Sequence, residues 1–376
     1  MKRVHVCLVS KEPIPNLVPL RCPGLEPDSV VLLVTGEMSA QAGRLERVMA
    51  RWGIRDVSRI PVAAYDPSAV SAVCNAIIAD HSDDHLLLNA TGGTKIMALA
   101  AFETFARNNC EAFYVDSANR SILSLSGGPS AYPFADVVDV ADYLSAYGQE
   151  ITAQQSVNAQ APAYRAVAGR IVSDVDRFSD AIAILNSYVA QHRDDTRWPQ
   201  SVPIKKVPAF AAWRELLNLL QSNGICKMKG NALEFASPEA VQFVSGDWLS
   251  FHVYETVMGI SPRDARLETT VQWDQRETKP PVNNYDVLFT VRNRLYLIEC
   301  KTKYFKEEQT TPFTVETVYK LDSLRDAAGG LFGKGMLVSY RALPDDMKSR
   351  LRAIKLEYCE GAGIRNLAVR LKLMIQ

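Results

Sequence analysis

The sequence lacks an excess of charge of either sign. Its 376 residues include 42 lysines and arginines and 42 aspartates and glutamates, so its formal net charge is zero. Proteins that coat nucleic acid with a broad basic surface carry a net positive charge. Any contact of this protein with nucleic acid is therefore expected in a local groove.

Paired cysteines and long apolar runs are also lacking. The seven cysteines are odd in number and never have the spacing Cys-x-x-Cys, which argues against a disulfide framework or a zinc module. No segment approaches the run of about 18 apolar residues that a membrane span needs, and the N-terminus has no signal-peptide pattern. We expect a cytoplasmic protein with reduced thiols and no membrane part.

The first part of the sequence alternates short apolar runs with amphipathic stretches. The apolar runs lie at 3–9, 30–35, 57–62, 85–90 and 111–116, and the amphipathic stretches at 38–52, 67–80 and 94–108. Strands that alternate with helices predict a parallel sheet covered on both faces. Residues 1–150 are therefore expected to form a Rossmann-like domain.

The remainder divides at a polar stretch from Ile151 to Tyr164. Helical patterns and a small hairpin follow, which predict a helical, winged-helix-like linker over 151–240. Residues 241–376 are typical of an α+β domain. Its expected elements are a helix at 248–258, a strand at 267–273, a hairpin at 286–301, a helix at 315–328, a strand at 335–340 and a final helix.

The segment 285–303, YDVLFTVRNRLYLIECKTK, predicts a β-hairpin with the two-residue turn Arg292-Asn293. This turn sets Asp286 directly opposite Glu299 on the neighbouring strand. Lys301 follows on the same face as Glu299, because strand side chains alternate with a period of two. A three-residue turn would break this register.

Opposed carboxylates on one sheet face repel each other. A divalent cation such as magnesium or manganese would turn this repulsion into attraction, because such ions prefer oxygen ligands. The Lys301 ammonium could then orient water or stabilise charge on a phosphate. The hairpin therefore indicates a phosphodiesterase site, although Glu-x-Lys is also common on solvated strand faces.

A second group of residues follows the expected strand His85–Asn89. Glycines in Thr91-Gly92-Gly93-Thr94-Lys95 allow close backbone approach, while free N–H groups at a helix start and Lys95 attract anions. The pattern is neither a Walker A loop nor Gly-x-Gly-x-x-Gly, which argues against mononucleotide hydrolysis and dinucleotide redox chemistry. The alternative is a tight turn in which Thr94 caps the helix.

Two further loops are expected at the same edge of the sheet, where ligands of open α/β folds bind. They follow the first and second strands, and their alternative is a plain strand-to-helix connection. The full set of expected ligand-binding residues is Ser10, Lys11, Gly36, Glu37, Met38, Thr91, Gly92, Gly93, Thr94 and Lys95.

Taken together, these motifs resemble the CRISPR-associated Rossmann fold (CARF) effectors that are fused to a PD-(D/E)xK nuclease domain and activated by cyclic oligoadenylate. The resemblance covers nearly the whole chain. It rests on LVPL at 17–20, NATGGTK at 89–95, GDWL at 246–249, NNYDV at 283–287, IECKTK at 298–303 and YKLDSLRDAAGG at 319–330.

The resemblance implies that Asp286 and Glu299 bind a divalent metal, and we count Cys300 among the expected metal ligands. It also implies that Lys301 is the catalytic lysine and that Lys320, on the following helix, contacts substrate phosphate. The alternative for Lys320 is a solvated helix lysine.

One position departs from the family pattern. A glutamate on the helix after the GDWL motif often completes the metal shell, whereas this sequence has Ser250. Glu255 is a poor substitute, because five residues further along a helix it points roughly 140° away. The number of metals and their affinity therefore stay open.

We expect a homodimer that senses cyclic tetra-adenylate and cleaves nucleic acid, as implied by the resemblance to type III CRISPR antiviral effectors. The linker from about residue 151 is expected to connect the two sites. The substrate stays open between single-stranded RNA, single-stranded DNA and duplex DNA. Two rivals are a ligand-controlled regulator with an inactive nuclease domain and a repair or restriction nuclease that needs no activator.

Overall fold

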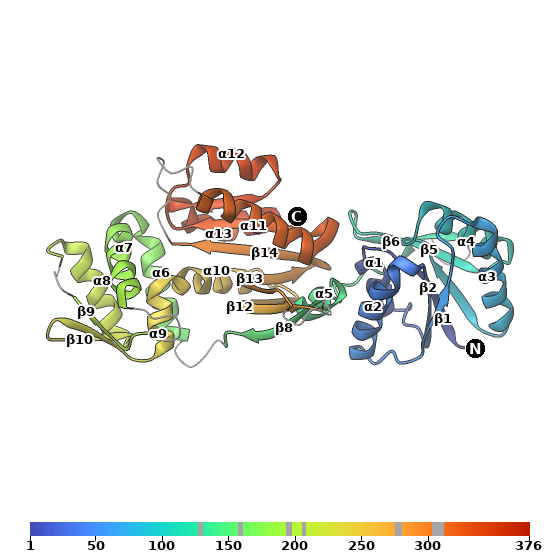
Figure 1. The fold of residues 1–376 in the computed structure, drawn as a ribbon, viewed down its shortest axis with the longest axis horizontal. Coiled ribbons are helices and arrows are strands. Elements are labelled where there is room, and N and C mark those ends of the chain that lie inside the picture. The colour runs from blue at the N-terminus through green and yellow to red at the C-terminus, as the bar shows by residue number, and fades with distance from the viewer. Residues whose placement is uncertain (127–130, 157–160, 193–197, 205–207, 275–279, 303–311) are drawn as a thin grey trace.

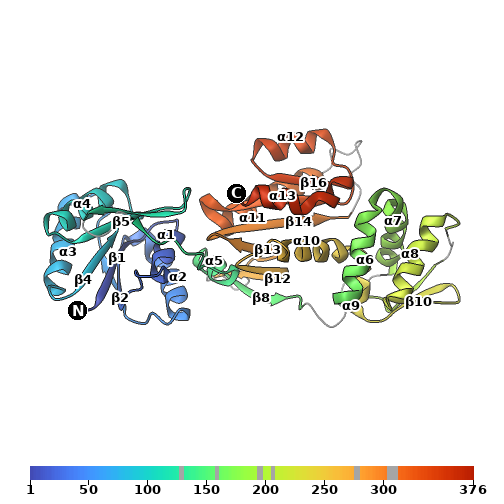
Figure 2. The same cartoon turned by 180° about the vertical axis from the view of Figure 1, so that it is seen from behind.

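The computed structural model describes residues 1–376 except 127–130, 157–160, 193–197, 205–207, 275–279 and 303–311. It consists of three parts arranged in a row (Figure 1). A Rossmann-like domain lies at one end, a second α/β domain in the middle and a mainly helical part at the other end. The view from behind shows the same order (Figure 2).

The Rossmann-like domain contains a seven-stranded sheet of order β3-β2-β1-β4-β5-β6-β7. Strands β1 to β5 are parallel, and β6 and β7 pair antiparallel at one edge. The expected parallel sheet is thereby confirmed. The strands are β1 (Arg3–Leu8), β2 (Ser29–Val34), β3 (Val57–Pro61), β4 (His85–Asn89), β5 (Glu111–Asp116), β6 (Ser121–Ser126) and β7 (Ala131–Tyr132).

Helices cover both faces of this sheet, as expected for βαβ units. Helices α3 (Pro67–Asp80) and α4 (Lys95–Arg107) pack on one face, and α1 (Ile14–Leu17) and α2 (Ser39–Arg51) on the other. Two short helices accompany them: η1 (Val18–Arg21) follows α1, and η2 (Gly36–Met38) directly precedes α2. Strands are added to one side of β1 as far as β3 and to its other side from β4 onward, so the carboxyl ends of the adjacent strands β1 and β4 border a natural ligand site.

The middle domain contains a six-stranded sheet of order β16-β15-β14-β13-β12-β8. Its strands are β8 (Gln149–Gln154), β12 (Asp264–Trp273), β13 (Val282–Val291), β14 (Arg294–Lys301), β15 (Lys334–Ser339) and β16 (Glu357–Glu360). Its helices are α5 (Val140–Ala146), α10 (Trp248–Met258), α11 (Pro312–Gly329), α12 (Asp345–Ala353) and α13 (Leu367–Met374), with the short helices η3 (Phe243–Asp247), η4 (Gly330–Phe332) and η5 (Gly361–Asn366).

The predicted hairpin is confirmed in its turn and its register. Both turn residues have positive φ, 55° for Arg292 and 57° for Asn293, as a two-residue hairpin turn of this hand requires. Strand β13 pairs antiparallel with β14 with Val291 opposite Arg294. Asn293 is buried, and its side chain accepts hydrogen bonds from the backbone N–H groups of 137 and 138. Lys303, at the end of the predicted segment, lies outside the described residues.

The helical part contains α6 (Ala161–Ser173), α7 (Val175–His192), α8 (Ala211–Ser222) and α9 (Pro238–Gln242). A small sheet of order β10-β11-β9 accompanies them, formed by β9 (Ser201–Pro203), β10 (Cys226–Lys229) and β11 (Ala232–Phe235). This combination of helices with a β-hairpin resembles a winged helix.

The helical part does not lie between the other two domains, contrary to our expectation of a connecting linker (Figures 1 and 2). Helix α5 and strand β8 make that connection, and β8 pairs with β12 as the edge strand of the middle sheet. The polar stretch from Ile151 to Tyr164 predicts a domain boundary, because it has few large apolar residues. Half of the residues of strand β8 are exposed at the edge of the sheet, and such exposed strand residues are also small and polar.

No helix in the described part of the chain is long and apolar enough to cross a membrane.

Candidate active site and ligand cavity

Three carboxylates lie side by side across three neighbouring strands of the middle sheet. The pairing of β12 with β13 sets Glu268 opposite Asp286. The pairing of β13 with β14 sets Asp286 opposite Glu299. The structure thus brings together the two predicted acids and adds a third that the sequence analysis missed.

Glu268 and Asp286 line a cavity of about 220 Å³ at the start of helix α10, together with a further acid, Asp247. The lining residues are Gly246, Asp247, Ser250, Glu268, Asp286, Cys300, Lys301 and Thr302. The expected catalytic lysine therefore lies at the same cavity as the acids. Glu299 is 4% exposed, beneath the surface of the site.

Each carboxylate accepts one short hydrogen bond, one from helix α10 and two from consecutive residues of strand β14. The Ser250 hydroxyl donates to Glu268 Oε1 at 2.5 Å, and the Cys300 N–H donates to Asp286 Oδ2 at 2.5 Å. The Lys301 ammonium donates to Glu299 Oε1 at 2.5 Å. One ammonium therefore faces these three carboxylates, Asp247 adds a fourth acid to the cavity lining, and the cluster is short of positive charge.

This shortage changes the protonation of the site. Burial and the neighbouring carboxylates of Glu299 and Glu268 raise the pKa of Asp286 well above its usual range. Burial and Asp247 raise the pKa of Glu268 to about 7, against the hydrogen bond from Ser250. Like charges held close together in a poorly solvated site have this effect.

Lys301 is affected in the opposite sense. Burial lowers the pKa of Lys301, but the attraction of Glu299 and Asp286 outweighs it and holds the pKa above its usual value. The ammonium is therefore charged at neutral pH and can act as a fixed cation. A fixed cation next to a phosphodiester stabilises negative charge that develops during cleavage.

The donor set suits a divalent cation of the magnesium or manganese type. Such ions bind carboxylate oxygens, and an ion at this site would compensate the charge that Lys301 leaves unbalanced. Among the described residues, however, no three His, Cys, Asp or Glu side chains already converge on a metal position. Glu268 and Asp286 line one cavity with Glu299 beside it, but each carboxylate is held by its own hydrogen-bond donor.

The thiol of the expected metal ligand Cys300 does not suit a magnesium or manganese ion. Burial, followed by the charge of Asp286, raises the pKa of its thiol well above its usual value, so the thiol stays protonated. A protonated thiol is a poor ligand for a hard cation. Only the backbone carbonyl of Cys300 offers an oxygen of the required type.

Lys320 is not brought into the cavity. It lies exposed on helix α11 and is absent from the residues that line the site. The structure is thus compatible with a contact to substrate outside the cavity, or with the alternative of a solvated helix lysine.

The helix position where the family often has a glutamate is filled by a different arrangement. Ser250 on α10 is 2% exposed and places its hydroxyl against Glu268, so strand β12 supplies the carboxylate that the helix lacks. Glu255 points elsewhere, as expected, and pairs with Arg165. The backbone at Glu268 has φ of 43°, an uncommon conformation for a non-glycine residue that often occurs at functional sites.

The Rossmann-like domain contains a second cavity, of about 580 Å³, at the carboxyl ends of its parallel strands. Four consecutive connections line it. The lining residues are Val9, Ser10, Lys11, Thr35, Gly36, Glu37, Met38, Val62, Ala63, Ala64, Tyr65, Gly93, Thr94 and Met97. Seven of the ten expected ligand-binding residues are among them: Ser10, Lys11, Gly36, Glu37, Met38, Gly93 and Thr94.

The other three lie beside the cavity and not in its lining. Thr91 donates to Asn89 Oδ1 at 2.7 Å and accepts from the Val115 N–H at 2.8 Å, which fixes the turn. A side chain at Gly92 would place its Cβ 2.0 Å from the Leu8 carbonyl oxygen, so only glycine fits there. Lys95 is exposed at the start of α4.

The structure also supports the alternative reading of Thr94. Its hydroxyl accepts a hydrogen bond from the Met97 N–H at 3.2 Å, which makes it the cap of helix α4. The same hydroxyl donates to the Ala64 carbonyl at 2.6 Å and so joins the fourth strand's turn to the third. Capping and lining of the cavity are thus combined in one residue.

Sequence reasoning missed the third connection, which contributes Tyr65. Its side chain is 79% exposed at the cavity, which is unusual for an aromatic residue. Its position after the third parallel strand was the available signal, because the same rule had selected the loops after the first and second strands.

The fold and these two sites define a two-domain effector with a Rossmann-like ligand-binding domain and an endonuclease domain. Family models match both parts: "Card1 CARF domain" over residues 4–143 and "Card1-like, endonuclease domain" over residues 237–367. The chain therefore belongs to the Card1 family of CARF effectors. Its endonuclease domain is that of a phosphodiester hydrolase.

Solved structures agree with this assignment. Protein VC1899 from Vibrio cholerae has 24% identity and a TM-score of 0.89, with 98% of this chain and 97% of that chain covered. Can2 from Sulfobacillus thermosulfidooxidans, solved in complex with cyclic tetra-adenylate, has 27% identity and a TM-score of 0.81, with 100% and 99% covered.

A type III CRISPR defence DNA nuclease activated by cyclic oligoadenylate has 19% identity and a TM-score of 0.58, with 91% of this chain and 46% of that chain covered. At this identity, and at that of VC1899, the likeness concerns the fold. No match is found among curated protein sequences.

Proposed function

We propose that this protein is a nuclease of type III CRISPR antiviral defence that is activated by cyclic tetra-adenylate and requires a divalent metal. The observation that carries the proposal is the cavity lined by Glu268, Asp286 and Lys301, with the buried Glu299 directly behind it and bonded to the Lys301 ammonium. Three buried or half-buried acids with one base destabilise a fold unless a cation binds there. The likeness to Can2 over the full length supports the activator.

Asp286, Glu299, Glu268 and the Cys300 carbonyl would hold the metal. The ion supplies charge neutralisation and polarisation of the scissile phosphate when it is bound. Ser250 orients Glu268 through its hydroxyl. Lys301, which is fixed by Glu299, is placed to donate a hydrogen bond to the oxygen on which negative charge develops.

Glu268 has a protonation state suited to proton transfer. Its pKa of about 7 lies close to neutral pH, where a carboxylate can both accept and release a proton. Water that attacks a phosphodiester must lose a proton, and Glu268 lines the cavity in which this occurs. We therefore assign Glu268 either to metal binding or to the removal of this proton from the attacking water.

The activator is assigned to the cavity of the Rossmann-like domain. Backbone N–H groups of the Gly93 turn and the start of α4 suit phosphate groups, and Lys11 and Lys95 add positive charge. Tyr65 offers an exposed aromatic ring on which an adenine base can stack. A ring of four identical units has a two-fold axis, so an isologous dimer is its natural receptor.

An exposed apolar face next to this cavity supports the homodimer. Tyr114 on β5 pairs with Leu123 on β6, and both point away from the core residues on the opposite side of the sheet. The face consists of Ile96, Leu99, Tyr114, Leu123 and Leu125, which are 39–66% exposed. Contiguous exposed apolar residues of this kind mark protein interaction sites. Leu99→Arg should give a monomer by light scattering, and an unchanged mass would contradict this interface.

A cleavage panel tests the proposed function. Labelled single-stranded RNA, single-stranded DNA and duplex DNA are incubated with the protein in magnesium and in manganese, with and without cyclic tetra-adenylate. The proposal predicts cleavage of at least one substrate that needs both the metal and the activator. Cleavage of none of them under any condition would support the rival of an inactive nuclease domain.

A further inference from the structure

Helix α2 starts at the ligand cavity and ends at the nuclease domain. The loop Gly36–Met38, which lines the cavity, runs directly into α2 (Ser39–Arg51) with no intervening residue. The helix has 13 residues and is therefore roughly 20 Å long. A displacement of the loop would therefore move the whole helix, which is a rigid element of this length.

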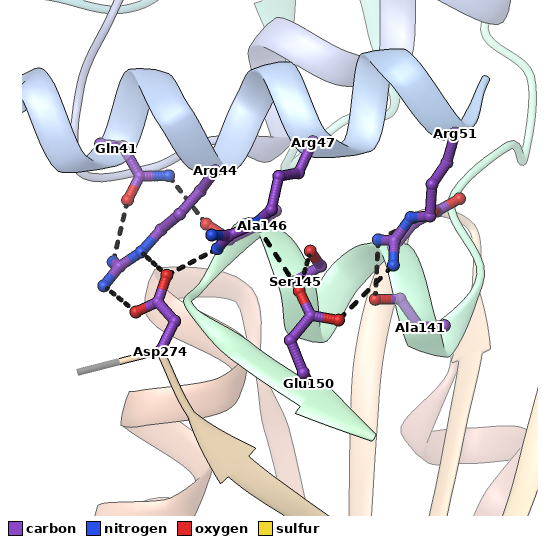
Figure 3. Close-up of polar contacts among 10 residues, drawn as sticks. Gln41, Arg44, Arg47, Arg51, Ala141, Ser145, Ala146, Glu150 and Asp274 are labelled. Carbon is purple, nitrogen blue, oxygen red and sulfur yellow. Dashed lines mark hydrogen bonds and ion pairs between the residues drawn. The ribbon is translucent and has the colours of Figure 1, made fainter. Parts of the chain in front are cut away.

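One face of α2 is bound to the nuclease domain by ion pairs (Figure 3). Arg44 donates two hydrogen bonds to Asp274. Its Nε donates to Oδ2 at 3.1 Å and its Nη2 donates to Oδ1 at 2.8 Å. Arg47 donates to Asp274 Oδ2 at 2.6 Å. Bidentate pairs of this type fix orientation as well as distance.

The ion pair between Arg44 and Asp274 is shielded from solvent. The two side chains are 25% and 17% exposed, unlike the freely solvated pairs that contribute little to stability. A Cβ at Gly148 would lie 2.5 Å from Arg44 Cζ, so the guanidinium packs against bare backbone. The carbonyl of Gly148 in turn accepts the Asp274 N–H at 2.9 Å. Close packing on both sides holds the contact in one arrangement.

Further contacts bind the same helix face to α5 and β8, among them an ion pair between Arg47 and Glu150 (Figure 3). Gln41 Nε2 donates to the Ala146 carbonyl at 2.8 Å. Arg51 pairs with Asp142 at 3.1 Å and lies 3.7 Å from Glu150. The contacts therefore extend along the helix and are not confined to one side chain. We call Gln41, Arg44, Arg47 and Arg51, with their partners, the α2 clamp.

The clamp acts on the strand that carries a carboxylate of the nuclease site. Asp274 directly follows β12 (Asp264–Trp273), and Glu268 lies within that strand. The two residues are six positions apart in the sequence, which is roughly 20 Å along a strand. Strand β8, which carries Glu150, is paired to the same end of β12, with Gln149 opposite Trp273. A shift of α2 is thus applied to β12 and to its neighbouring edge strand together.

We propose that helix α2 transmits occupancy of the ligand cavity to the nuclease site, with Asp274 as the residue on which it acts. This regulation rests on the proposed function. It replaces the helical linker expected from the sequence, which lies at the far end of the nuclease domain. An effector controls a distant site only if a structural element differs between two states, and the α2 clamp is the contact that both loop and strand share.

A second contact connects the first ligand loop to the same domain. Glu12 follows Ser10 and Lys11 of the cavity and accepts from the Tyr147 hydroxyl at 2.7 Å. The Leu331 N–H donates to Glu12 at 3.3 Å. Removal of the α2 clamp is therefore expected to reduce the coupling and not to abolish it.

The test compares the activation ratio of variants, which is the cleavage rate with saturating cyclic tetra-adenylate divided by the rate without it. Asp274→Asn should lower this ratio by at least about fivefold, the lower end of typical allosteric coupling. Glu46→Gln is the matched control, because Glu46 lies on α2 but pairs with Arg59 inside the Rossmann-like domain. The control should keep the wild-type ratio.

Arg44→Gln repeats the test from the helix side, so a poorly folded Asp274 variant does not prevent a decision. It too should lower the ratio by at least about fivefold. Ratios equal to that of the wild type in both variants would overturn the inference and leave the proposed function intact. A wild-type protein that binds cyclic tetra-adenylate, measured by calorimetry, but cleaves equally fast without it would contradict both.

Discussion

The Ser250 hydroxyl donates a hydrogen bond to the Glu268 carboxylate at 2.5 Å across the boundary between helix α10 and strand β12. The serine and the glutamate together replace the helix glutamate that related nucleases often have. The contact orients the carboxylate. Burial raises the pKa of Glu268, and the hydrogen bond from Ser250 keeps this pKa lower than burial alone would. It also gives two variants with separable effects.

Glu268→Gln should weaken manganese binding and reduce cleavage, because it removes one of the three carboxylates. Ser250→Ala keeps the carboxylate but removes the hydrogen bond that orients it. A smaller loss of metal affinity is therefore expected, roughly tenfold. Calorimetric titration with manganese measures both. Equal affinity of the wild type and Glu268→Gln would exclude Glu268 from the metal site.

The pH dependence of stability should report the raised pKa of Glu268. This glutamate ionises near pH 4.5 in the unfolded chain and at about 7 in the folded protein. Between these values the folded state keeps a proton that the unfolded state has released, so metal-free protein loses stability as the pH rises through this range. The loss is complete above about pH 7. Melting temperatures against pH should fall less steeply for Glu268→Gln, and parallel curves would contradict the assignment.

Asp286→Asn and Glu299→Gln should both remove cleavage while activator binding is retained. Their effects on metal-free stability should differ. Asp286→Asn removes a repelled charge and should raise the melting temperature, whereas Glu299→Gln also removes the partner of Lys301. Calorimetric melting in chelator measures the difference. Wild-type cleavage by either purified variant would contradict the site.

Lys301→Ala should reduce turnover by about a hundredfold or more while metal binding is spared, because the ammonium is assigned to charge on the phosphate. Single-turnover cleavage and manganese titration separate the two effects. A loss of metal affinity greater than that of Asp286→Asn would contradict this division of roles.

Lys95→Ala should raise the concentration of cyclic tetra-adenylate that gives half-maximal cleavage and leave the maximal rate nearly unchanged. Lys95 is exposed beside the cavity, and we assign its charge to ligand binding alone. Cleavage is measured against activator concentration for both proteins. Superimposable curves would exclude Lys95 from the sensor, and a variant inactive at saturation would show that it does more than bind.

Much of the nuclease site follows from local sequence. The turn Arg292-Asn293 fixes the register of the hairpin, and the register alone sets Asp286 opposite Glu299. Short-range rules suffice because the turn and both carboxylates belong to one continuous segment. The parallel sheet was predictable for a similar reason, since its apolar runs and helices alternate along the chain.

Glu268 could not be found in this way. It lies on a strand that reads as an ordinary alternation of apolar and polar residues, and it joins the site only through the pairing of β12 with β13. That pairing is tertiary information. The position of the helical part was also beyond local rules, because the edge pairing of β8 decides where the chain enters the middle sheet.

The central claim is that a cyclic nucleotide in the Rossmann-like domain permits metal-dependent cleavage at Asp286 and its neighbours. The most direct measurement is the cleavage rate of wild-type and Asp286→Asn protein in manganese, each with and without cyclic tetra-adenylate, and with chelator as a further condition. We expect cleavage only by the wild type and only with both activator and metal. Equal cleavage by the wild type without activator, or cleavage that persists in Asp286→Asn, would contradict the claim.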